Sequence, residues 1–444
     1  MTSWKHQSDI IPRLLAGNFI LAWEPGVGKT LPLLQAGASV TGPQLYLGPA
    51  SIISQVAREA VNFGIHPAKL VQRISSGKDK VDPKAQLVVC SYDLMASLPI
   101  WKQLFAREWG SLVLDEAHML KNTAAKRTRA VYGARIDSKG ALIRRAEKVW
   151  IATGTPILND PMDLWAHVSR CFPQVSLDCG QINRQRWLEE YCVFQETPYG
   201  PKVIAAKNTN QLQTRLHPIM SRLLKQDVLS LPPLIEETIY VPATKLDHSE
   251  VPEDAMLALM ALLAQPDPDA KELLKLEVPL ASLRRQIGLA KAAHAADLAT
   301  NALHGGANKV LMFYQHTEVG KILHEKLTAN HFNPVRYSGG LTQKQRNEVI
   351  HRFMTDPTCR VFIGQIQAAG TGLNLQAADR IYIVEPAWTP AVNEQAISRS
   401  YRGGQTKKVL ASYVVLEKSV DEQVTNVLRR KSKLIKAIME IKND

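Results

Sequence analysis

A phosphate-binding loop is predicted between residues 18 and 30. Five strand-like residues, Phe19–Trp23, lead into a glycine-containing turn that ends in Lys29 and Thr30 at the start of a helical pattern. The glycines let backbone N–H groups close around phosphates, the lysine can reach the outer phosphates, and the threonine hydroxyl suits their magnesium ion. The expected nucleotide-binding residues of this loop are Glu24, Gly26, Val27, Gly28, Lys29 and Thr30. Trp23 stands where the strict pattern has its first glycine, so a glycine-rich turn without chemistry is the alternative.

A second apolar run, Leu112–Leu114, ends in the adjacent carboxylates Asp115 and Glu116. Such a strand is typical of the second motif of a nucleotide triphosphatase, because it delivers two acids to the edge of a sheet. Asp115 would hold magnesium through water, and Glu116 would orient the attacking water. The alternative is a strand that ends in solvated acids, and the presence of both motifs in one chain disfavours it.

The charge balance favours a polyanionic partner. The 444 residues carry 54 Lys and Arg against 41 Asp and Glu, a formal charge of +13. Such an excess promotes binding to nucleic acid through counterion release, although many basic proteins bind none. The 45% hydrophobic and 21% charged residues are those of a globular chain, and its length allows two or three domains.

The spacing of the cysteines and the lengths of the apolar runs indicate in which cellular compartment the protein is expected. The five cysteines lack Cys-x-x-Cys spacing, so we expect neither a zinc site nor a disulfide framework. Residues 1–20 hold no signal-like segment, and no run reaches about 18 apolar residues. We expect no membrane association. The protein would be cytoplasmic and nucleoid-associated if its source is a bacterium or phage, and nuclear if its source is a eukaryote.

Apolar strands alternate with helix-length segments in both halves of the chain. The predicted strands are Phe19–Trp23, Leu45–Gly48, Leu87–Cys90, Leu112–Leu114, Val149–Ala152, Val310–Tyr314, Val335–Tyr337, Val361–Ile363, Ile381–Val384 and Ala411–Val415. This alternation predicts an α/β fold with two parallel sheets covered by helices. We expect a first lobe at 1–232 with a helical protrusion at about 171–232, a helix-bearing linker at 233–305 and a second lobe at 306–444.

Three segments near predicted strand ends are candidates for contact with nucleic-acid phosphates. Ser51 follows the second strand at a helix start, where a plain helix cap is the alternative. Thr153-Gly154-Thr155-Pro156 follows the fifth strand and could couple bound phosphate to nucleic acid, or be a turn without chemistry. The segment Lys121–Lys148 has nine Lys or Arg and two acids, typical of a solvated helical face or of a surface that follows a nucleic-acid backbone.

The second half lacks a phosphate loop but offers two arginines. Residues 395–402 are predicted to be helical, which places Arg399 and Arg402 on one helical face. An arginine pair on one domain facing a nucleotide on another is the arrangement of an arginine finger, and surface arginines are the alternative. Near the chain's start, Gln7 could read an adenine edge with its amide.

Taken in their order along the chain, these motifs resemble those of the Swi/Snf-type ATPases of helicase superfamily two, which are motors on double-stranded DNA. The similarity runs nearly end to end. The matching strings are Glu24–Thr30, Asp115–His118 (a DEAH sequence), Thr153–Ile157 with Asn159 and Leu164, Gly370–Leu375, and Gln395–Gln405.

Part of the first half is most similar to the annealing-helicase branch, whose members rewind and remodel replication forks. The residues concerned are Tyr191-Cys192, Asn208, and Lys225–Leu229 with Leu231-Pro232. Two departures stand out: the usual Asp-Glu-Met reads Trp23-Glu24-Pro25, and the usual paired arginines read Arg222-Leu223. Substrate-recognition, zinc-finger and chromatin-reading extensions are absent from the sequence, so a bare motor is expected.

The resemblance implies two RecA-like lobes that bind ATP and Mg²⁺ between them. Its partner would be double-stranded DNA, forked or branched, together with an unidentified targeting protein. The implied catalytic residues are Glu116, Arg399 and Arg402; Gln7 and Gly372 would join the phosphate loop at the nucleotide; and Thr30 and Asp115 would hold the metal. The implied DNA contacts are Ser51, Lys121, Thr155, Ser338, Gly339, Thr371 and Trp388, the last with a core position as its alternative. The rival functions are a strand-separating DNA or RNA helicase and a nucleic-acid-binding scaffold with an inactive nucleotide site.

Overall fold

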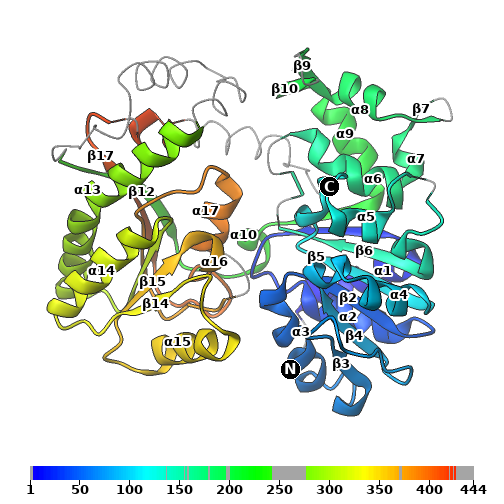
Figure 1. Ribbon diagram of the computed structural model, residues 1–444, viewed down its shortest axis with the longest axis horizontal. Coiled ribbons are helices and arrows are strands. Elements are labelled where there is room, and N and C mark those ends of the chain that lie inside the picture. Colours follow the sequence, from blue (N-terminus) through cyan, green and yellow to red (C-terminus); the bar gives the residue numbers. More distant parts are fainter. Residues whose placement is uncertain are drawn as a thin grey trace. The chain divides into compact units, whose positions relative to one another are not determined.

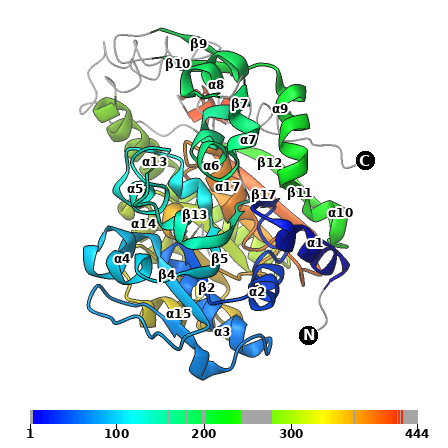
Figure 2. The ribbon, with the colours of Figure 1, turned by 90° about the vertical axis from the view of Figure 1, so that its right-hand side faces the viewer.

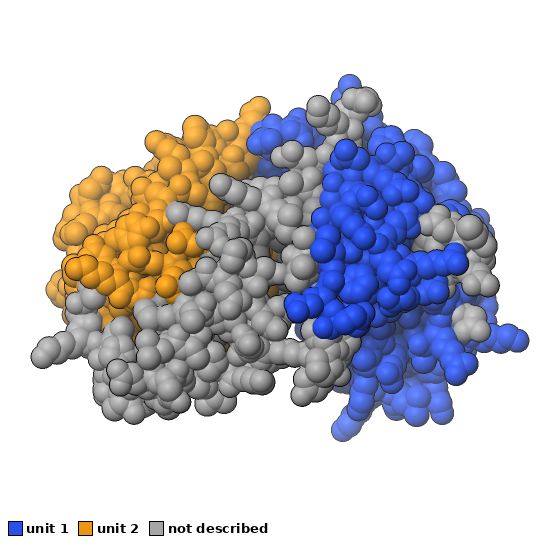
Figure 3. Space-filling view, turned by 90° about the horizontal axis from the view of Figure 1, so that it is seen from above, with its two compact units in different colours: residues 1–229, 435–444 blue, residues 230–434 orange. Residues whose placement is uncertain are grey.

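The computed structural model describes most of the chain in two compact units. The described residues are 4–136, 138–154, 156–157, 160–178, 181–196, 201–242, 277–369, 373–419, 421–423 and 425–426. Those up to residue 229 form the first unit, and those from residue 230 onward form the second (Figure 3). Both units are α/β, as predicted (Figure 1).

A parallel sheet of seven strands forms the centre of the first unit. Its order is β11-β1-β6-β5-β2-β4-β3. The strands are β1 (Phe19–Trp23), β2 (Gln44–Gly48), β3 (Val71–Arg73), β4 (Leu87–Ser91), β5 (Trp109–Asp115), β6 (Ala146–Ala152) and β11 (Met220–Leu223). The five strands predicted for this half are confirmed, and β3 and β11 are additional.

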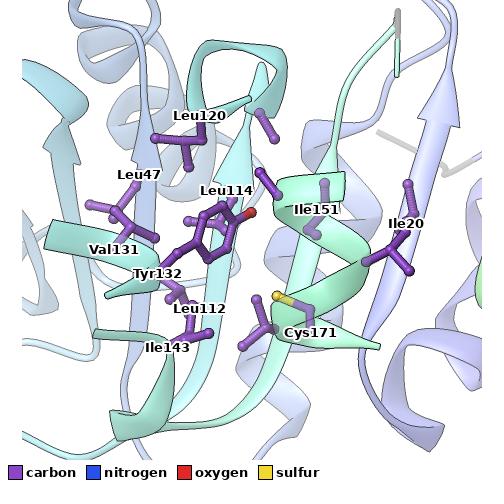
Figure 4. Packing of buried hydrophobic residues seen from close by; sticks show 14 of the residues in the cluster. Ile20, Leu47, Leu112, Leu114, Leu120, Val131, Tyr132, Ile143, Ile151 and Cys171 are labelled. Atoms are coloured by element: carbon purple, nitrogen blue, oxygen red, sulfur yellow. The ribbon is translucent and has the colours of Figure 1, made fainter. Parts of the chain in front are cut away.

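Helices cover both faces of this sheet because its strands are apolar on both sides. One face meets α1 (Lys5–Ala16), α2 (Thr30–Ser39) and α3 (Ala50–Asn62), and α1 lies beside α2 (Figure 2). The other face meets α4 (Leu98–Phe105), α5 (Lys126–Tyr132) and α6 (Trp165–Cys171). On that side, Leu112, Leu114 and Ile151 of the sheet meet Tyr132 and Cys171 of the helices (Figure 4). Side chains alternate between faces along each strand, which is why Tyr46 lies on the face opposite Leu45 and Leu47.

The protrusion predicted to be helical at about 171–232 also contains strands, so that prediction is partly wrong. Its elements are α7 (Pro173–Ser176), β7 (Leu177–Asp178), β8 (Gln181–Ile182), α8 (Arg184–Tyr191), β9 (Cys192–Gln195), β10 (Lys202–Ala206) and α9 (Thr209–Leu216). The strands pair as two short antiparallel hairpins, β7 with β8 and β9 with β10. The chain then returns to the main sheet as β11, which pairs with β1, and continues into α10 (Lys225–Val228).

Short 3₁₀ helices connect several elements of this unit. They are η1 (Ala68–Leu70), η2 (Tyr92–Ala96), η3 (Ala117–Leu120), η4 (Leu142–Arg145), η5 (Pro161–Leu164) and η6 (His217–Ile219). Two of them bear on the site, because η2 follows β4 and η3 follows β5 at the edge where the strands end.

The second unit has a parallel sheet of six strands in the order β12-β17-β16-β13-β15-β14. The strands are β12 (Leu234–Val241), β13 (Val310–Tyr314), β14 (Val335–Tyr337), β15 (Val361–Gln365), β16 (Arg380–Ile383) and β17 (Val409–Leu416). One face meets α13 (Glu277–His304) and α14 (Thr317–Ala329), and the other meets α15 (Gln343–Thr355), α16 (Ile366–Ala369) and α17 (Pro390–Ile397). A capping box starts α15, because the Thr342 N–H donates to Gln345 Oε1 at 2.9 Å and the Gln345 N–H donates to Thr342 Oγ1.

The five strands predicted for this half are confirmed, and β12 is additional. It lies in the stretch expected to be a linker, yet it pairs with β17 along its whole length, from Leu234 with Val409 to Val241 with Leu416. The helix α13 also packs on the sheet. Both elements therefore belong to the second unit. None of the described helices is long and apolar enough to cross a membrane.

Candidate nucleotide and nucleic-acid site

The turn between β1 and α2 has the backbone of a phosphate loop. Gly26 and Gly28 adopt φ of 93° and 86°, which residues with a side chain rarely adopt. A Cβ atom at Gly28 would also lie 2.4 Å from Nε2 of Gln7. Both glycines are therefore required by the backbone itself. Val27 between them is fully buried.

Lys29 and Thr30 lie where this loop enters α2. The Lys29 ammonium is buried and donates to the carbonyl oxygens of Trp23 at 2.8 Å and Glu24 at 3.4 Å. Thr30 is the first residue of α2, a helix of 10 residues whose N-terminus favours anions. The loop thus offers a cation, free helix-end amides and a hydroxyl within one turn of chain.

The Gln7 amide holds α1 to the loop. Its Nε2 donates to the Gly28 carbonyl at 2.9 Å, and its Oε1 accepts the Trp4 N–H at 2.8 Å. The neighbouring His6 ring lies 3.1 Å from the Val27 carbonyl. Both ends of the Gln7 amide are therefore engaged by the protein, and its reading of adenine stays a prediction.

Asp115 and Glu116 follow β5 at the same edge of the sheet. The Asp115 carboxylate is buried, with Oδ1 accepting the Glu116 N–H at 2.8 Å and Oδ2 accepting the Tyr46 hydroxyl at 2.7 Å. Burial, and next the charge of Glu116, raise the pKa of Asp115 to about 6, while Lys29 opposes the shift. Glu116 has φ of 49°, and its carboxylate lies 3.3 Å from Nδ1 of His118. The Glu116 side chain is thus directed by a strained backbone and an imidazole neighbour.

These residues fit a nucleotide with magnesium. Thr30 and Asp115 supply hydroxyl and carboxylate oxygens, the hard donors that Mg²⁺ prefers. The Tyr46 hydroxyl donates to Asp115 at 2.7 Å, and the nearby Thr30 side chain opposes the rise that burial causes in the pKa of this tyrosine. The described residues hold no cluster of three His, Cys, Asp or Glu suited to a metal, and magnesium carried by phosphates needs none. Sequence reasoning missed Tyr46, although a tyrosine inside a buried strand always needs a partner for its hydroxyl.

Arg222 of β11 ties the phosphate loop to the loop after β6. Its Nη1 donates to the carbonyl oxygens of Ala22 at 2.7 Å and Gly154 at 3.0 Å, and its Nη2 lies 4.0 Å from Glu24 Oε1. The other Glu24 oxygen accepts the Lys225 N–H at 2.9 Å. Arg222 is the arginine kept where the resemblance has a pair, and the following residue, Leu223, packs against the core.

The helical placement of the second unit's arginines is wrong. Helix α17 ends at Ile397, and Arg399 and Arg402 lie in the turns that follow. The helix stops because its next carbonyls find other partners: the Arg399 side chain donates to Gln395 O at 3.0 Å, and the Arg399 carbonyl accepts the Leu375 N–H at 2.9 Å. Arg402 donates to Leu373 O at 3.2 Å. Both arginines therefore adjoin the loop before β16 without sharing a helical face.

The residues predicted to contact DNA have unequal settings. Ser51 is the second residue of α3, whose N-cap is Pro49, so the alternative of a plain helix cap is wrong, and its contact with DNA stays a prediction. Lys121 forms an ion pair with Asp163 at 2.9 Å. Thr155, Thr371 and Gly372 lie outside the described residues.

In the second unit, the loop after β14 carries Ser338 and Gly339. The Gly339 N–H donates to Gln365 Oε1 at 3.2 Å. Trp388 is half-buried, packs against the core on the α13 side of the sheet, and has the Arg284 guanidinium 4.7 Å from its ring. This setting fits the core alternative, and contact of Trp388 with DNA stays a prediction.

Much of the positive charge in Lys121–Lys148 serves the fold. Arg145 donates to Phe105 O at 2.8 Å and pairs with Glu108 at 2.8 Å. Arg127 donates to Met119 O at 3.1 Å, and Lys148 pairs with Glu147 at 3.0 Å. Only the seven residues of α5 are α-helical within the described part of this segment. A continuous basic helical face is therefore not formed there.

Comparisons with known proteins bear on both units. Residues 13–257 match the SNF2-related domain family, and residues 291–404 match the helicase conserved C-terminal domain family. The chain is 25% identical to the DNA annealing helicase and endonuclease ZRANB3 of Mus musculus, over 94% of this chain and 39% of that protein. It is 26% identical to the SWI/SNF-related matrix-associated actin-dependent regulator of chromatin subfamily A-like protein 1 of Xenopus tropicalis, over 94% of this chain and 43% of that protein. The chain thus spans less than half the length of these relatives. A solved structure, the Sulfolobus solfataricus SWI2/SNF2 ATPase core in complex with dsDNA, is similar with a TM-score of 0.45 and 21% identity, over 99% of this chain and 93% of that chain.

Proposed function

Because this chain belongs to the SNF2-related domain family and also matches the helicase C-terminal domain family, we propose that it is an ATP-driven translocase on double-stranded DNA. The observation that carries the proposal is the joint presence of the phosphate loop and the Asp115-Glu116 pair at one edge of the first sheet. A parallel sheet binds ligands at the carboxyl ends of its strands, which is where both motifs lie.

Within this proposal, Lys29 and the amides at the start of α2 bind the phosphates, and Thr30 and Asp115 hold the magnesium. The magnesium ion would supply charge neutralisation on the phosphate oxygens. Glu116 orients the attacking water, and its backbone at φ of 49° together with His118 directs the carboxylate. Arg402, with Arg399, stabilises charge on the transferred phosphoryl group.

The preferred substrate is forked or branched DNA. One relative named above supports this choice, since it is named as a DNA annealing helicase. Ser51, Lys121, Ser338, Gly339 and Trp388 are the candidates for contact with the DNA backbone among the described residues, and Thr155 and Thr371 are the candidates outside them. Each nucleotide state would favour a different arrangement of the two units, which would advance the motor along the duplex.

The test compares two substrates under one ATP condition. A duplex translocase strips the third strand from a triplex, whereas a strand separator opens a tailed duplex. We expect triplex displacement, no opening of the tailed duplex, and phosphate release that rises with duplex or forked DNA. Opening of the tailed duplex without triplex displacement would favour a conventional helicase, and no DNA-stimulated phosphate release would indicate an inactive scaffold.

A further inference from the structure

Tyr46 lies in the middle of β2 with its side chain fully buried. In the sheet it is opposite Val113 of β5, two residues before Asp115. Residues two apart on a strand point to the same face, so Tyr46 and Asp115 share the face that meets α2. Tyr46 is therefore placed by strand register to reach the end of β5 and the start of α2 at once.

The Tyr46 hydroxyl contacts a proposed metal-binding residue from this position. It donates to Asp115 Oδ2 at 2.7 Å. The Thr30 side chain is near enough to oppose the rise that burial causes in the pKa of Tyr46. A carboxylate oxygen has room for a further donor, so the bond from Tyr46 leaves Asp115 able to accept from a magnesium-bound water. One buried group from β2 thereby fixes a carboxylate at the end of β5 that is proposed to hold the metal.

Packing alone does not require this hydroxyl. A phenylalanine would fill the strand interior with the same ring, and a buried hydroxyl is costly unless it is hydrogen-bonded. Here the partner, Asp115, belongs to the proposed nucleotide site. Asp115 has one further donor at its carboxylate, the Glu116 N–H at 2.8 Å, which acts on the other oxygen and so cannot replace the phenol.

We propose that Tyr46 is a positioning residue that holds the Asp115 carboxylate in the orientation needed by nucleotide-bound magnesium. The inference rests on the proposed function, because it needs a magnesium–nucleotide site in the first unit. It adds a residue that touches neither phosphate nor metal. Such outer partners typically change metal affinity about 10- to 100-fold when they are removed.

The test is Tyr46→Phe in the full chain. Binding of a fluorescent ADP is measured in EDTA and then across a magnesium titration. We expect unchanged affinity in EDTA, and a magnesium concentration for half-maximal tightening that rises roughly tenfold or more. The matched control is Tyr132→Phe, because Tyr132 is equally buried and its hydroxyl bonds His167 Nδ1 at 2.8 Å, away from the site. This variant should lose stability without moving the magnesium midpoint.

The outcomes separate this inference from the function beneath it. If the unaltered protein binds ADP without any dependence on magnesium, the result contradicts the proposed function itself, whatever the Tyr46 variant does. If it shows that dependence and Tyr46→Phe keeps the same midpoint, Tyr46 is a packing residue only. A shift of equal size in both tyrosine variants, or a loss of affinity in EDTA as well, would likewise overturn the positioning role, since general loosening of the fold would then explain it.

Discussion

Replacing Asp115 by Asn should stabilise the nucleotide-free protein at neutral pH while it damages the nucleotide site. Asp115 is buried, and burial and Glu116 raise its pKa from 3.8 to about 6. Above pH 6 the folded protein must hold this carboxylate ionised at a cost, and an amide of the same shape avoids that cost. The difference of about 2 pKa units corresponds to about 3 kcal/mol of unfolding free energy, at about 1.4 kcal/mol per unit.

The direction of the pKa shift determines the pH range in which Asp115→Asn should be more stable than the unaltered protein. An acid whose pKa is raised by folding adds stability below its unfolded pKa and loses that stability as pH rises through the folded value. The advantage of Asp115→Asn should therefore be largest above pH 6, decline between pH 6 and 4, and vanish below. Between about pH 7.5 and pH 5 the advantage should fall by roughly half.

Urea unfolding of the full chain, followed by tryptophan fluorescence at several pH values, measures this difference. Seven of the eight tryptophans precede residue 230, so the signal reports chiefly on the unit that contains Asp115. Asp160→Asn is the matched control: burial also raises the pKa of Asp160 to about 6, and asparagine can keep its cap bond to the Met162 N–H. It should show the same pH trend with nucleotide binding intact. A gain independent of pH, or a loss at pH 7.5, would refute the reasoning for Asp115.

Three further predictions concern the proposed motor. Glu116→Gln should bind nucleotide but lose phosphate release by roughly 10²-fold or more, because the carboxylate orients water and Lys29 does the binding; near-normal release would remove Glu116 from the chemistry. Arg402→Ala should lower the turnover rate by ~10³-fold or more with ADP affinity kept, while Arg352→Ala on the exposed face of α15 should not; equal rates for both would make Arg402 a surface residue. Duplex affinity, measured by fluorescence anisotropy, should fall at least ~10³-fold between 50 and 200 mM salt and depend little on base sequence, and a flat salt response would exclude backbone tracking.

The predicted strands were those whose residues are apolar on both faces. The bounds of β13 match the prediction because it is a fully buried run flanked by polar turns. In contrast, β12 lies at a sheet edge and includes exposed Glu236, so its pattern resembles a charged linker. The short β11 includes Ser221 and Arg222, whose polar atoms serve Trp23 and the site loops rather than the solvent. Such edge strands, whose polar side chains are exposed or bond other parts of the protein, lack the apolar pattern from which the other strands were predicted.

The site was predicted where local sequence alone determines geometry. The glycines at 26 and 28 have positive φ, so their identity encodes the loop. Arg399 was misplaced because the bonds that end α17 come from a distant loop, including the Leu375 N–H. Tyr46 was missed for a related reason: an aromatic residue in an apolar strand looks the same whether its hydroxyl meets Asp115 or nothing of consequence. The end of helix α17 and the role of the Tyr46 hydroxyl both depend on contacts with residues distant in the sequence, and the local sequence does not reveal such contacts.

The position of β11 also dictates when the first unit can be completed during synthesis. Strand β1, which leads into the phosphate loop, lies between β6 and β11, and Ile20 pairs with Met220. One side of β1 must therefore remain an open edge until the ribosome has made the entire protrusion and the strand beyond it. Such non-local pairing is slow to form, and an open apolar edge invites association with other chains. In a nascent chain, the phosphate loop is therefore made long before the strand that completes the support of β1.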